Sequence, residues 1–554
     1  MTDRQTDRQT DRQTDRQTDR QTDRQTDRQT DRQFKCSVLD VINNKNYRFV
    51  FVTTIVFGLL CHGIMLFNKY LTYDDANYFA LVGSTYKSGR WMLGILEDLT
   101  HVLFGSYPYS IPVVNGFLTI IFIAIAACLI VNLFCINNKL LICAESMLLV
   151  STPVVTSMMG YMFTAPYYGL GLLLSVFGAF LICKYRKWYS VLAGIIVCAC
   201  SIGVYQAFLP VSLCILLFYM IKEIFDSENA VWTVFLKKTF YYLATTFASL
   251  GIYVLLNKLF LTIHHEQLSD YQGISGMGKA SVSEYLHRFL FSYKNFINPS
   301  VGINGEPKLT AFLYPMSARF LYRILLILIA ATIVFLIYLA FKSDIRKAFQ
   351  IFILVCLIPP AVNFIYIVSD PKVVYSLMLY GQVMIFVFWG WIIQTITPHL
   401  RYKTAKRAVS VAGICIIIAF SLIYLRYDNV CYLKLDLQQS REVSYFTTLV
   451  TRIKSVEDYK EEYPVVYINE QKINDSTIGE VSELGIVTIP PYHLNAMDSL
   501  NNYAWKSCVK LWTGFSPELK EAKDFENLQE VKAMPSYPND GSIKVINNTV
   551  VVKF

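Results

Sequence analysis

Residues 111–136 read IPVVNGFLTIIFIAIAACLIVNLFCI and contain no charged side chain. A helix needs about 20 predominantly apolar residues to cross the roughly 30 Å hydrocarbon core of a lipid bilayer. This stretch is long enough to do so. It therefore predicts one membrane-spanning helix.

Ten further apolar stretches make the predicted protein polytopic. The chain has 554 residues, of which 54% are hydrophobic and only 16% are charged, and its mean hydropathy is +0.39. These values are far from those of an average soluble protein. We predict an all-α polytopic membrane protein with about eleven transmembrane helices. The other ten expected spans are residues 49–66, 140–162, 167–183, 189–204, 208–221, 240–260, 320–341, 351–368, 375–396 and 408–424.

The positions of lysine and arginine predict the orientation. Short basic connections occur at every second position between the expected spans, and an excess of positive charge is typical of cytoplasmic loops. They are residues 43–48, 137–139, 184–187, 222–238, 342–347 and 401–407. We expect the N-terminus in the cytoplasm, and the long connections 68–110 and 261–318, with everything after residue 426, on the outer face. The net charge of +9 follows largely from the cytoplasmic loops, and no basic patch interleaved with aromatic residues predicts nucleic-acid binding.

Composition divides the chain into three parts. Residues 1–33 form a low-complexity tail, residues 34–426 a transmembrane domain, and residues 427–554 a small extracytoplasmic domain. Alternating apolar segments separated by turn residues predict a mixed α/β fold for the last part. Its expected strands are residues 464–469, 485–490 and 543–552, with turns at Asn539-Asp540-Gly541 and Asn547-Asn548.

Residues 2–33 are eight perfect copies of Thr-Asp-Arg-Gln. If a four-nucleotide DNA repeat underlies them, the genetic code allows one solution, ACA GAC AGA CAG, which repeats the unit ACAG. Because four is not a multiple of three, gaining or losing one unit would shift the reading frame downstream. The peptide has no apolar residue after Met1 and is expected to be disordered. Its inferred DNA resembles the tracts of phase-variable surface-antigen genes in bacteria, many of which encode glycosyltransferases.

The cysteines and histidines make no metal-ligand set. Cys198-x-Cys200 lies within an expected span, and both cysteines are interpreted as small apolar residues that pack between helices. A disulfide between Cys431 and Cys508 in the external domain is an open alternative, because that domain is expected in an oxidising compartment. The run His264-His265-Glu266, at the outer end of a span, is interpreted as an interfacial loop.

The first outward connection holds the residues best suited to chemistry. It contains Tyr73-Asp74-Asp75 and then Gly89-Arg90-Trp91. In a sugar transfer, one carboxylate of the pair can accept the proton of the attacking hydroxyl while its neighbour positions it. Arg90 offers a fork of donors for a phosphate leaving group, and Trp91 and Tyr73 offer flat faces for a sugar ring. The alternative is that the acidic pair caps a loop helix and that Trp91 is an interfacial anchor.

Other charged residues near the membrane are further candidates. Arg319, Arg323 and Lys258 lie at the outer ends of expected spans and join Arg90 as candidates for binding the donor phosphate. Snorkelling to lipid headgroups is the alternative for at least one of them. Glu145, in the inner half of a span, is expected to hydrogen-bond between helices. No cofactor is expected; a divalent metal is the open alternative, with candidate ligands Asp74, Asp75, Glu97 and Asp98.

The placement of these residues resembles one known family. An acidic pair directly after the first span, a following Gly89-Arg90, about ten further spans and an external C-terminal module resemble the bacterial O-antigen glucosyltransferases of serotype-converting phages, of Gtr type II. The closing segments within residues 534–554 also look like the end of such proteins. The resemblance covers residues 38–554. It implies a GT-C membrane glycosyltransferase fold, a polyprenyl-phosphate-linked glucose donor, and catalysis in the acidic loop by Asp74 and Asp75 with Arg90.

We therefore predict an inverting hexosyltransferase of the bacterial inner membrane. It would use a polyprenyl-phosphate-hexose donor, with glucose as the first candidate, and a surface glycan acceptor such as O-antigen or lipopolysaccharide. A separate lipid-sugar flippase and a polyprenyl-phosphate-sugar synthase are expected partners. No nucleotide site is expected, because the chain has no glycine-rich phosphate loop. Two alternatives stay open: a lipid-linked sugar transporter or flippase, although the repeats typical of transporters are not visible, and a glycan polymerase or ligase.

Overall fold

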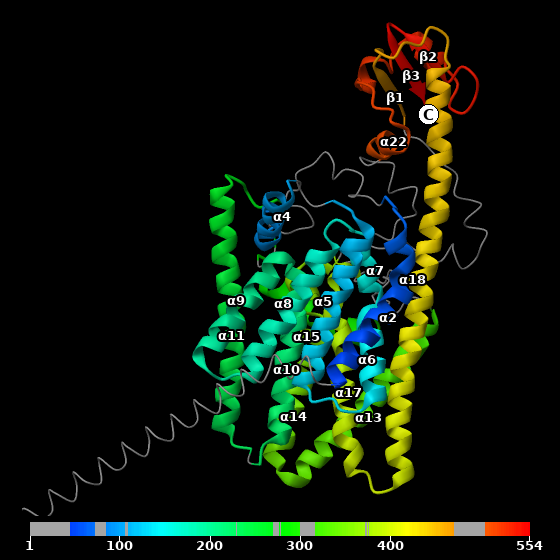
Figure 1. Cartoon of the computed structure of the whole chain (residues 1–554). Coiled ribbons are helices and arrows are strands. Elements are labelled where there is room, and N and C mark those ends of the chain that lie inside the picture. The colour runs from blue at the N-terminus through cyan, green and yellow to red at the C-terminus, as the bar shows by residue number, and fades with distance from the viewer. Residues whose placement is uncertain are drawn as a thin grey trace, which may run out of the picture.

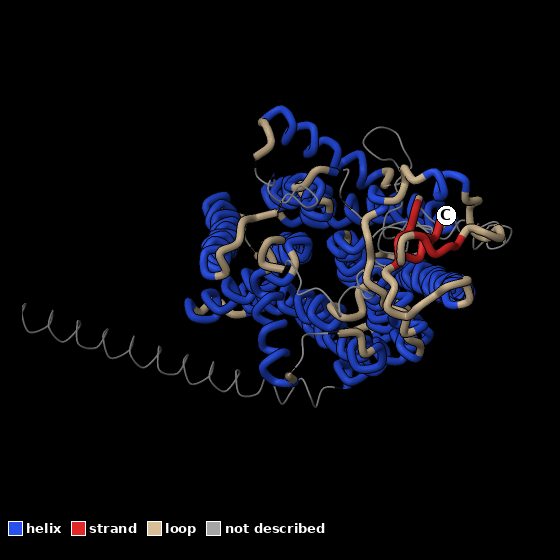
Figure 2. The backbone as a smooth tube through the Cα atoms, turned by 90° about the horizontal axis from the view of Figure 1, so that it is seen from above, coloured by secondary structure: helices blue, strands red, loops and turns tan. Residues whose placement is uncertain are grey.

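The computed structural model describes residues 45–71, 85–105, 109–228, 230–269, 276, 279–299, 316–371, 374, 376–469 and 505–554. Most of them are helical, and the helices form a bundle from which one long helix continues to a small domain containing strands (Figure 1). Seen from above, most bundle helices are viewed end-on, and the strands lie over one side of the bundle (Figure 2). The TDRQ repeat, Tyr73, Asp74, Asp75 and the expected strand 485–490 lie outside the described residues.

Nine helices in the described parts of the chain are long and apolar enough to cross a membrane, and the number is ten if one bent pair counts as a single span. This confirms the predicted polytopic helical fold. They are α2 (Lys45–Phe67), α5 (Pro112–Leu133), α8 (Ala165–Lys184), α10 (Leu209–Asp226) with the preceding turn η1 (Gln206–Phe208), α11 (Trp232–Ile263), α13 (Met316–Ser343), α14 (Ile345–Cys356) continuing into α15 (Ile358–Val362), α17 (Tyr380–Ile396) continuing into η5 (Thr397–His399), and α18 (Lys403–Lys454).

One predicted span remains, residues 189–204, and it corresponds to α9 (Trp188–Val204). This helix has 17 residues and is shorter than the other spans. It ends because Tyr205 is extended, with φ −158° and ψ 120°, and Pro210 lies in the first turn of the next helix. Residues 204–210 therefore form a break rather than a simple turn between two full spans. This break becomes part of the candidate site described below.

The bent pair consists of α6 (Lys139–Ser151) and α7 (Pro153–Met159), which meet at 42°. Pro153 has no N–H, so the Leu149 carbonyl loses its helical partner. Tyr380 Oη donates to this carbonyl at 2.7 Å, and His62 Nε2 donates to the neighbouring Val150 carbonyl at 2.9 Å. A membrane protein tolerates such a break only where other groups pair with the freed backbone, and here α17 and α2 supply them.

Helix α17 lies in the core of the bundle, since nearly all of its side chains are buried. It packs against α6, α10, α13, α15 and α18. Helix α11 is the opposite case, because large apolar side chains such as Phe240, Phe247 and Leu255 are exposed along it. In a membrane protein such a surface faces lipid.

Helix α18 has 52 residues, which corresponds to about 78 Å at 1.5 Å per residue. This is far more than a bilayer needs, and the helix rises beyond the bundle to the C-terminal strands (Figure 1). The expected domain boundary at residue 427 falls inside it. The last part of α18 contributes Phe446, Leu449 and Ile453 to the apolar core of the C-terminal domain.

The C-terminal domain is a small mixed α/β unit, as predicted. Its three strands have the order β1-β3-β2, with β1 parallel and β2 antiparallel to β3. The turn between β2 and β3 consists of Asn547 and Asn548, which have φ of 49° and 54°, as a tight hairpin requires. Cys431 on α18 and Cys508 on α22 are both buried, and no disulfide joins them. The elements are β1 (Val465–Ile468), β2 (Ile543–Ile546), β3 (Thr549–Lys553), α22 (Trp505–Thr513), η6 (Ala522–Asp524) and α23 (Gln529–Ala533).

Candidate functional site: the Arg90 turn

The connection expected to face outward, residues 68–110, contains a tight turn, residues 85–90, that leads into α4 (Trp91–Phe104). Three backbone hydrogen bonds close it, including Arg90 N to Thr85 O at 3.1 Å and Gly89 N to Tyr86 O at 2.9 Å. Gly89 has a φ of +68°, and a Cβ there would lie 2.9 Å from both Gln206 Nε2 and Tyr253 Oη. Glycine is thus required for conformation and for space, and it fixes where Arg90 begins.

Two polar side chains from other helices hold this turn. Gln206 Nε2, in the break between α9 and α10, donates to the carbonyls of Ser88 at 2.9 Å and Gly89 at 3.1 Å. Tyr253 Oη of α11 donates to the Gly89 carbonyl at 3.1 Å. The turn is therefore attached to the bundle at residues far from it in the sequence.

Arg90 lies half-buried among tyrosines. Its guanidinium carbon is 4.9 Å from the centroid of the Tyr205 ring, and its Nη1 lies 3.4 Å from Tyr168 Oη. The two tyrosine rings are themselves 5.2 Å apart. A guanidinium held against aromatic faces keeps its charge and presents several N–H donors in a fixed plane. In surroundings poorer in water, such a group attracts an anion more strongly than it would in bulk solvent.

Trp91 is 3% exposed, and its indole stacks on Phe260 of α11 with ring centroids 5.7 Å apart. A Cβ on Gly203 would lie 2.5 Å from the same indole, so the ring packs closely on α9. Trp91 is thus a packing residue between α4, α9 and α11 in this structure. Its predicted contact with a sugar stays a prediction.

Two acidic residues of α4 fasten the start of the turn. Glu97 Oε2 accepts from Thr85 Oγ1 at 2.8 Å, and Asp98 Oδ2 accepts from Tyr86 Oη at 2.7 Å. Burial raises the pKa of the Glu97 carboxyl to about 7, and the nearby Asp98 charge adds to this, while the Thr85 hydrogen bond and Arg90 oppose it. Glu97 and Asp98, two of the candidate ligands in the metal alternative, thus bond to the turn. Among the described residues no group of three or more His, Cys, Asp or Glu side chains could hold a metal ion.

The turn is also joined to the end of α11, where an interfacial loop was expected. Tyr86 stacks on His264 with ring centroids 3.9 Å apart. Lys87 Nζ lies 3.1 Å from Glu266 Oε2, and the Lys87 carbonyl accepts from Ser269 N at 2.9 Å. The start of the second long connection therefore packs on the end of the first.

Residues 63–386 match the protein family described as Glucosyl transferase GtrII. The chain belongs to this family. The matched region starts near the end of α2, includes the whole Arg90 turn and α4, and ends within α17. No curated protein matches the chain. The family resemblance stated from the sequence is confirmed, and glycosyl transfer is the class of activity that the family represents.

The other predicted cations of this GtrII-family chain lie on α11 and α13. Lys258 is exposed on α11, the helix that also presents Tyr253 to the turn. Arg319 is half-buried and Arg323 is exposed on α13, which packs against α14, α17 and α18, whereas α4 packs against α9 and α11. The structure thus brings Arg90 together with tyrosines and Gln206, and places Arg319 and Arg323 on a different part of the bundle.

Glu145 of α6 differs from expectation. It is buried, but within the described part of the chain neither carboxylate oxygen has a hydrogen-bond partner. A Cβ on Gly390 of α17 would lie 1.7 Å from Glu145 Oε1. The carboxyl group therefore makes a close helix-to-helix contact, but the expected hydrogen bond between helices is absent.

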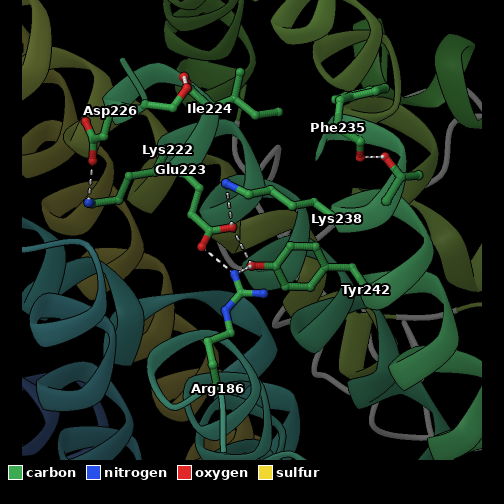
Figure 3. Close-up of polar contacts among 10 residues, drawn as sticks. Arg186, Lys222, Glu223, Ile224, Asp226, Phe235, Lys238 and Tyr242 are labelled. Atoms are coloured by element: carbon green, nitrogen blue, oxygen red, sulfur yellow. Dashed lines mark hydrogen bonds and ion pairs between the residues drawn. The ribbon is translucent and has the colours of Figure 1, made fainter. Parts of the chain in front are cut away.

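A second polar cluster lies at the other ends of α8, α10 and α11 (Figure 3). Glu223 is its centre: it pairs with Arg186, lies 3.7 Å from Lys238 Nζ, and accepts from Tyr242 Oη at 2.9 Å. Arg186 Nη2 also donates to Tyr242 Oη at 3.1 Å. These charges come from the basic connections 184–187 and 222–238 and pair with one another, so they tie three helices together.

Sequence reasoning selected Arg90 as a candidate but missed the residues that the structure places around it. Tyr168, Tyr205, Gln206 and Tyr253 were not predicted, because each belongs to another helix or its end. One signal was available: Gln206 is a polar residue between two apolar stretches. A polar residue at such a position must find a partner, and here it finds the backbone of residues 88 and 89.

Proposed function

We propose that this glycosyltransferase moves a hexose, with glucose as the first candidate, from a polyprenyl-phosphate carrier to a cell-surface glycan such as O-antigen or lipopolysaccharide. The observation that supports this most is Arg90. It closes the first outward connection, lies against Tyr205 and Tyr168, and belongs to the region matched by the GtrII family. A lipid-phosphate donor needs such a cation beside the membrane, because its leaving group is an anion.

The proposed reaction is a single displacement at the anomeric carbon. An acceptor hydroxyl attacks this carbon while Asp74 or Asp75 takes its proton. The bond from the anomeric carbon to the phosphate oxygen breaks, and polyprenyl phosphate leaves with the electron pair. Arg90 stabilises the negative charge on the departing phosphate. One displacement inverts the configuration of the sugar.

The proposed orientation places this chemistry on the outer face of the bacterial inner membrane. The N-terminus is then cytoplasmic and the C-terminal domain extracytoplasmic, as the basic connections predict. Arg319, Arg323 and Lys258 remain proposed secondary contacts for the phosphate or for lipid headgroups. A synthase must load the carrier with sugar, and a flippase must bring it to the outer face. The ACAG tract inferred from the repeat makes expression phase-variable.

The test compares surface glycans from cells with and without the intact gene, together with a strain that carries Arg90→Ala. We expect the disrupted strain and Arg90→Ala to lack one side-branch hexose while the glycan chain length stays the same. A shortened chain would indicate a polymerase or ligase instead. Accumulation of unflipped lipid-linked sugar on the inner leaflet would indicate a flippase.

A further inference from the structure

Helix α12 (Val282–Ile297) lies within the connection 261–318, which was expected to be an outward loop. Ser281 Oγ accepts from Glu284 N at 3.2 Å and caps its start, and Glu284 pairs with Arg288 one turn later. It is therefore a regular helix with a well-defined first turn. What distinguishes it is the distribution of its apolar side chains.

The exposed surface of α12 contains an apolar stripe, with the exposed polar residues Ser283, His287 and Lys294 along one edge of it. Val282, Leu286, Leu290 and Ile297 have exposed fractions between 60% and 87%. They follow one another at i, i+4, i+8 and i+15, a spacing that aligns them in one stripe along a helix. We call these four residues the α12 stripe.

The opposite face of α12 is largely polar, and it is the buried one. Arg288, Ser292 and Asn295 are buried there, together with one apolar residue, Phe291. Asn295 Nδ2 donates to Asn363 Oδ1 at 3.2 Å, and Asn363 Nδ2 donates to the Ser292 carbonyl at 2.9 Å. Gln382 Nε2 of α17 donates to the same Asn363 oxygen at 2.8 Å. A helix that packs on a protein from the water side has the reverse arrangement, with apolar residues inside and polar residues outside.

The neighbours of α12 are membrane spans. Tyr293 Oη donates to the carbonyl of Cys356, the last residue of α14, at 2.7 Å. Cys356 lies eleven residues after Ile345, where α14 begins, so it is about 17 Å along that helix. Tyr322 of α13 donates to the Phe296 carbonyl at 2.8 Å. Both partners lie inside helices that are apolar and long enough to cross the membrane.

We infer that α12 is embedded in the membrane, with the α12 stripe in contact with the acyl chains of one leaflet. The leaflet is that on the side of Arg90, because α12 connects the end of α11, where His264 stacks on Tyr86, to the start of α13. The span that follows, α13, also presents exposed apolar residues: Phe320, Ile327 and Val334 are between 67% and 69% exposed. The connection 261–318 is thus anchored in the bilayer by its own helix, whatever sugar the enzyme transfers.

The experiment measures which quenchers reach position 290. Full-length Leu290→Cys is labelled with a thiol-reactive bimane and reconstituted in phosphatidylcholine and phosphatidylglycerol vesicles, and labelled native protein provides the background from cysteines such as Cys415. Quenching by acyl-chain nitroxides is compared with quenching by iodide. Leu255→Cys on the exposed face of α11 is the lipid reference, and Thr448→Cys, exposed on α18 beyond the bundle, is the water reference. Leu286→Cys provides a second position in the stripe.

We expect Leu290→Cys and Leu286→Cys to match Leu255→Cys within about twofold, with strong quenching by the acyl-chain nitroxide and weak quenching by iodide. Iodide quenching like that of Thr448→Cys would show a helix in water and overturn the inference. Protection from both quenchers would show that protein covers the stripe, and it would overturn the inference as well.

Discussion

At the scale of the residue, Gly89 fixes the position of Arg90. The positive φ of Gly89 and its close approach to Gln206 and Tyr253 set the direction in which Arg90 leaves the turn. The sequence alone showed the pair Gly-Arg after an acidic pair, and this was enough to select Arg90. The sequence could not show which tyrosines lie around the guanidinium, since Tyr168 and Tyr205 are 78 and 115 positions away from Arg90 in the chain. Only the packing of α8 and α9 brings these tyrosines close to Arg90.

Replacing Arg90 by lysine tests the need for a planar fork of donors. Arg90→Lys keeps the positive charge but loses the guanidinium plane that lies against Tyr205. We expect hexose transfer to fall by roughly 100-fold, the size found when one donor to a transition-state anion is removed, with unchanged protein abundance. Lys87→Gln is the matched control, because it changes a charge three residues earlier that forms only a half-exposed ion pair with Glu266. Equal activity of Arg90→Lys and native protein would reduce Arg90 to a structural role.

Glu97 gives the fold a specific dependence on pH. Its pKa is about 7 in the folded chain against 4.5 as the ordinary value, so folding takes up a proton between these two pH values. The free energy of unfolding therefore falls as the pH rises through this window, by up to about 3 kcal/mol. Glu97→Gln keeps an acceptor for Thr85 and cannot ionise. From about pH 5 to about pH 8, the apparent melting temperature of the native protein should fall more than that of Glu97→Gln. An equal fall in the two melting temperatures over this pH range would refute the shifted pKa.

At the scale of the element, sequence periodicity located the helices well and their breaks poorly. Each of the eleven apolar stretches contains helix, but the stretch 140–162 is bent at Pro153, the stretch 351–368 is interrupted at Leu357 and Asn363, and residues 204–210 form a break. Apolar composition determines that a segment enters the membrane. Where it bends depends on side chains such as Tyr380 and His62, which pair with the freed carbonyls and are remote in the sequence. For the same reason α12 was missed: its membrane partners lie on other helices.

Helix α18 contacts residues 69–71, which follow α2 and precede the acidic pair Asp74-Asp75. Gln439 Oε1 accepts from Leu71 N at 2.7 Å, and its Nε2 donates to the Lys69 carbonyl at 3.1 Å. Tyr70 Oη donates to Asp436 Oδ1 at 3.1 Å, and Leu71 packs against the core of the C-terminal domain. The long helix α18 therefore holds the backbone three residues before Asp74.

Gln439→Glu tests whether this attachment matters for the reaction. Glutamate keeps the acceptor but loses the donor, and it places a carboxylate against the Lys69 carbonyl. We expect the rate of hexose transfer to fall about tenfold, which corresponds to the roughly 1.4 kcal/mol that one or two hydrogen bonds contribute, while the amount of folded protein stays the same. Thr448→Ala, at an exposed position of the same helix, should transfer like the native protein. Native rates for both variants would show that the attachment is dispensable.

At the scale of the whole molecule, composition predicted a polytopic membrane protein with a small mixed α/β unit at its C-terminus. The first follows from the large number of apolar residues, and the second from the change in composition after residue 426. The relation between the parts was not predictable. A boundary was expected at residue 427, and α18 runs through this position to Lys454. A helix can continue past the membrane surface, so a change in composition does not have to coincide with the end of a helix. The acidic pair lies outside the described residues, so its role stays a prediction.

The repeat at residues 2–33 predicts switching of the entire protein. An ACAG tract of this length holds about 24 units, and one unit gained or lost shifts every codon after Gln33. Sequencing of the tract in single colonies should show that a change of one unit removes the surface modification, while a change of three units preserves it. Mixed codons without a nucleotide repeat would end this explanation and leave the enzyme assignment intact.

The most direct measurement of the central claim uses the purified full-length protein in vesicles, with polyprenyl-phosphate glucose that is radiolabelled in the sugar and an isolated surface glycan as acceptor. We predict that label enters the glycan with the native protein, that at least one of Asp74→Asn and Asp75→Asn abolishes this transfer, and that polyprenyl phosphate is released in equal amount. Label that crosses the bilayer but remains on the lipid carrier, or transfer that is unchanged in both Asp variants, would contradict the account.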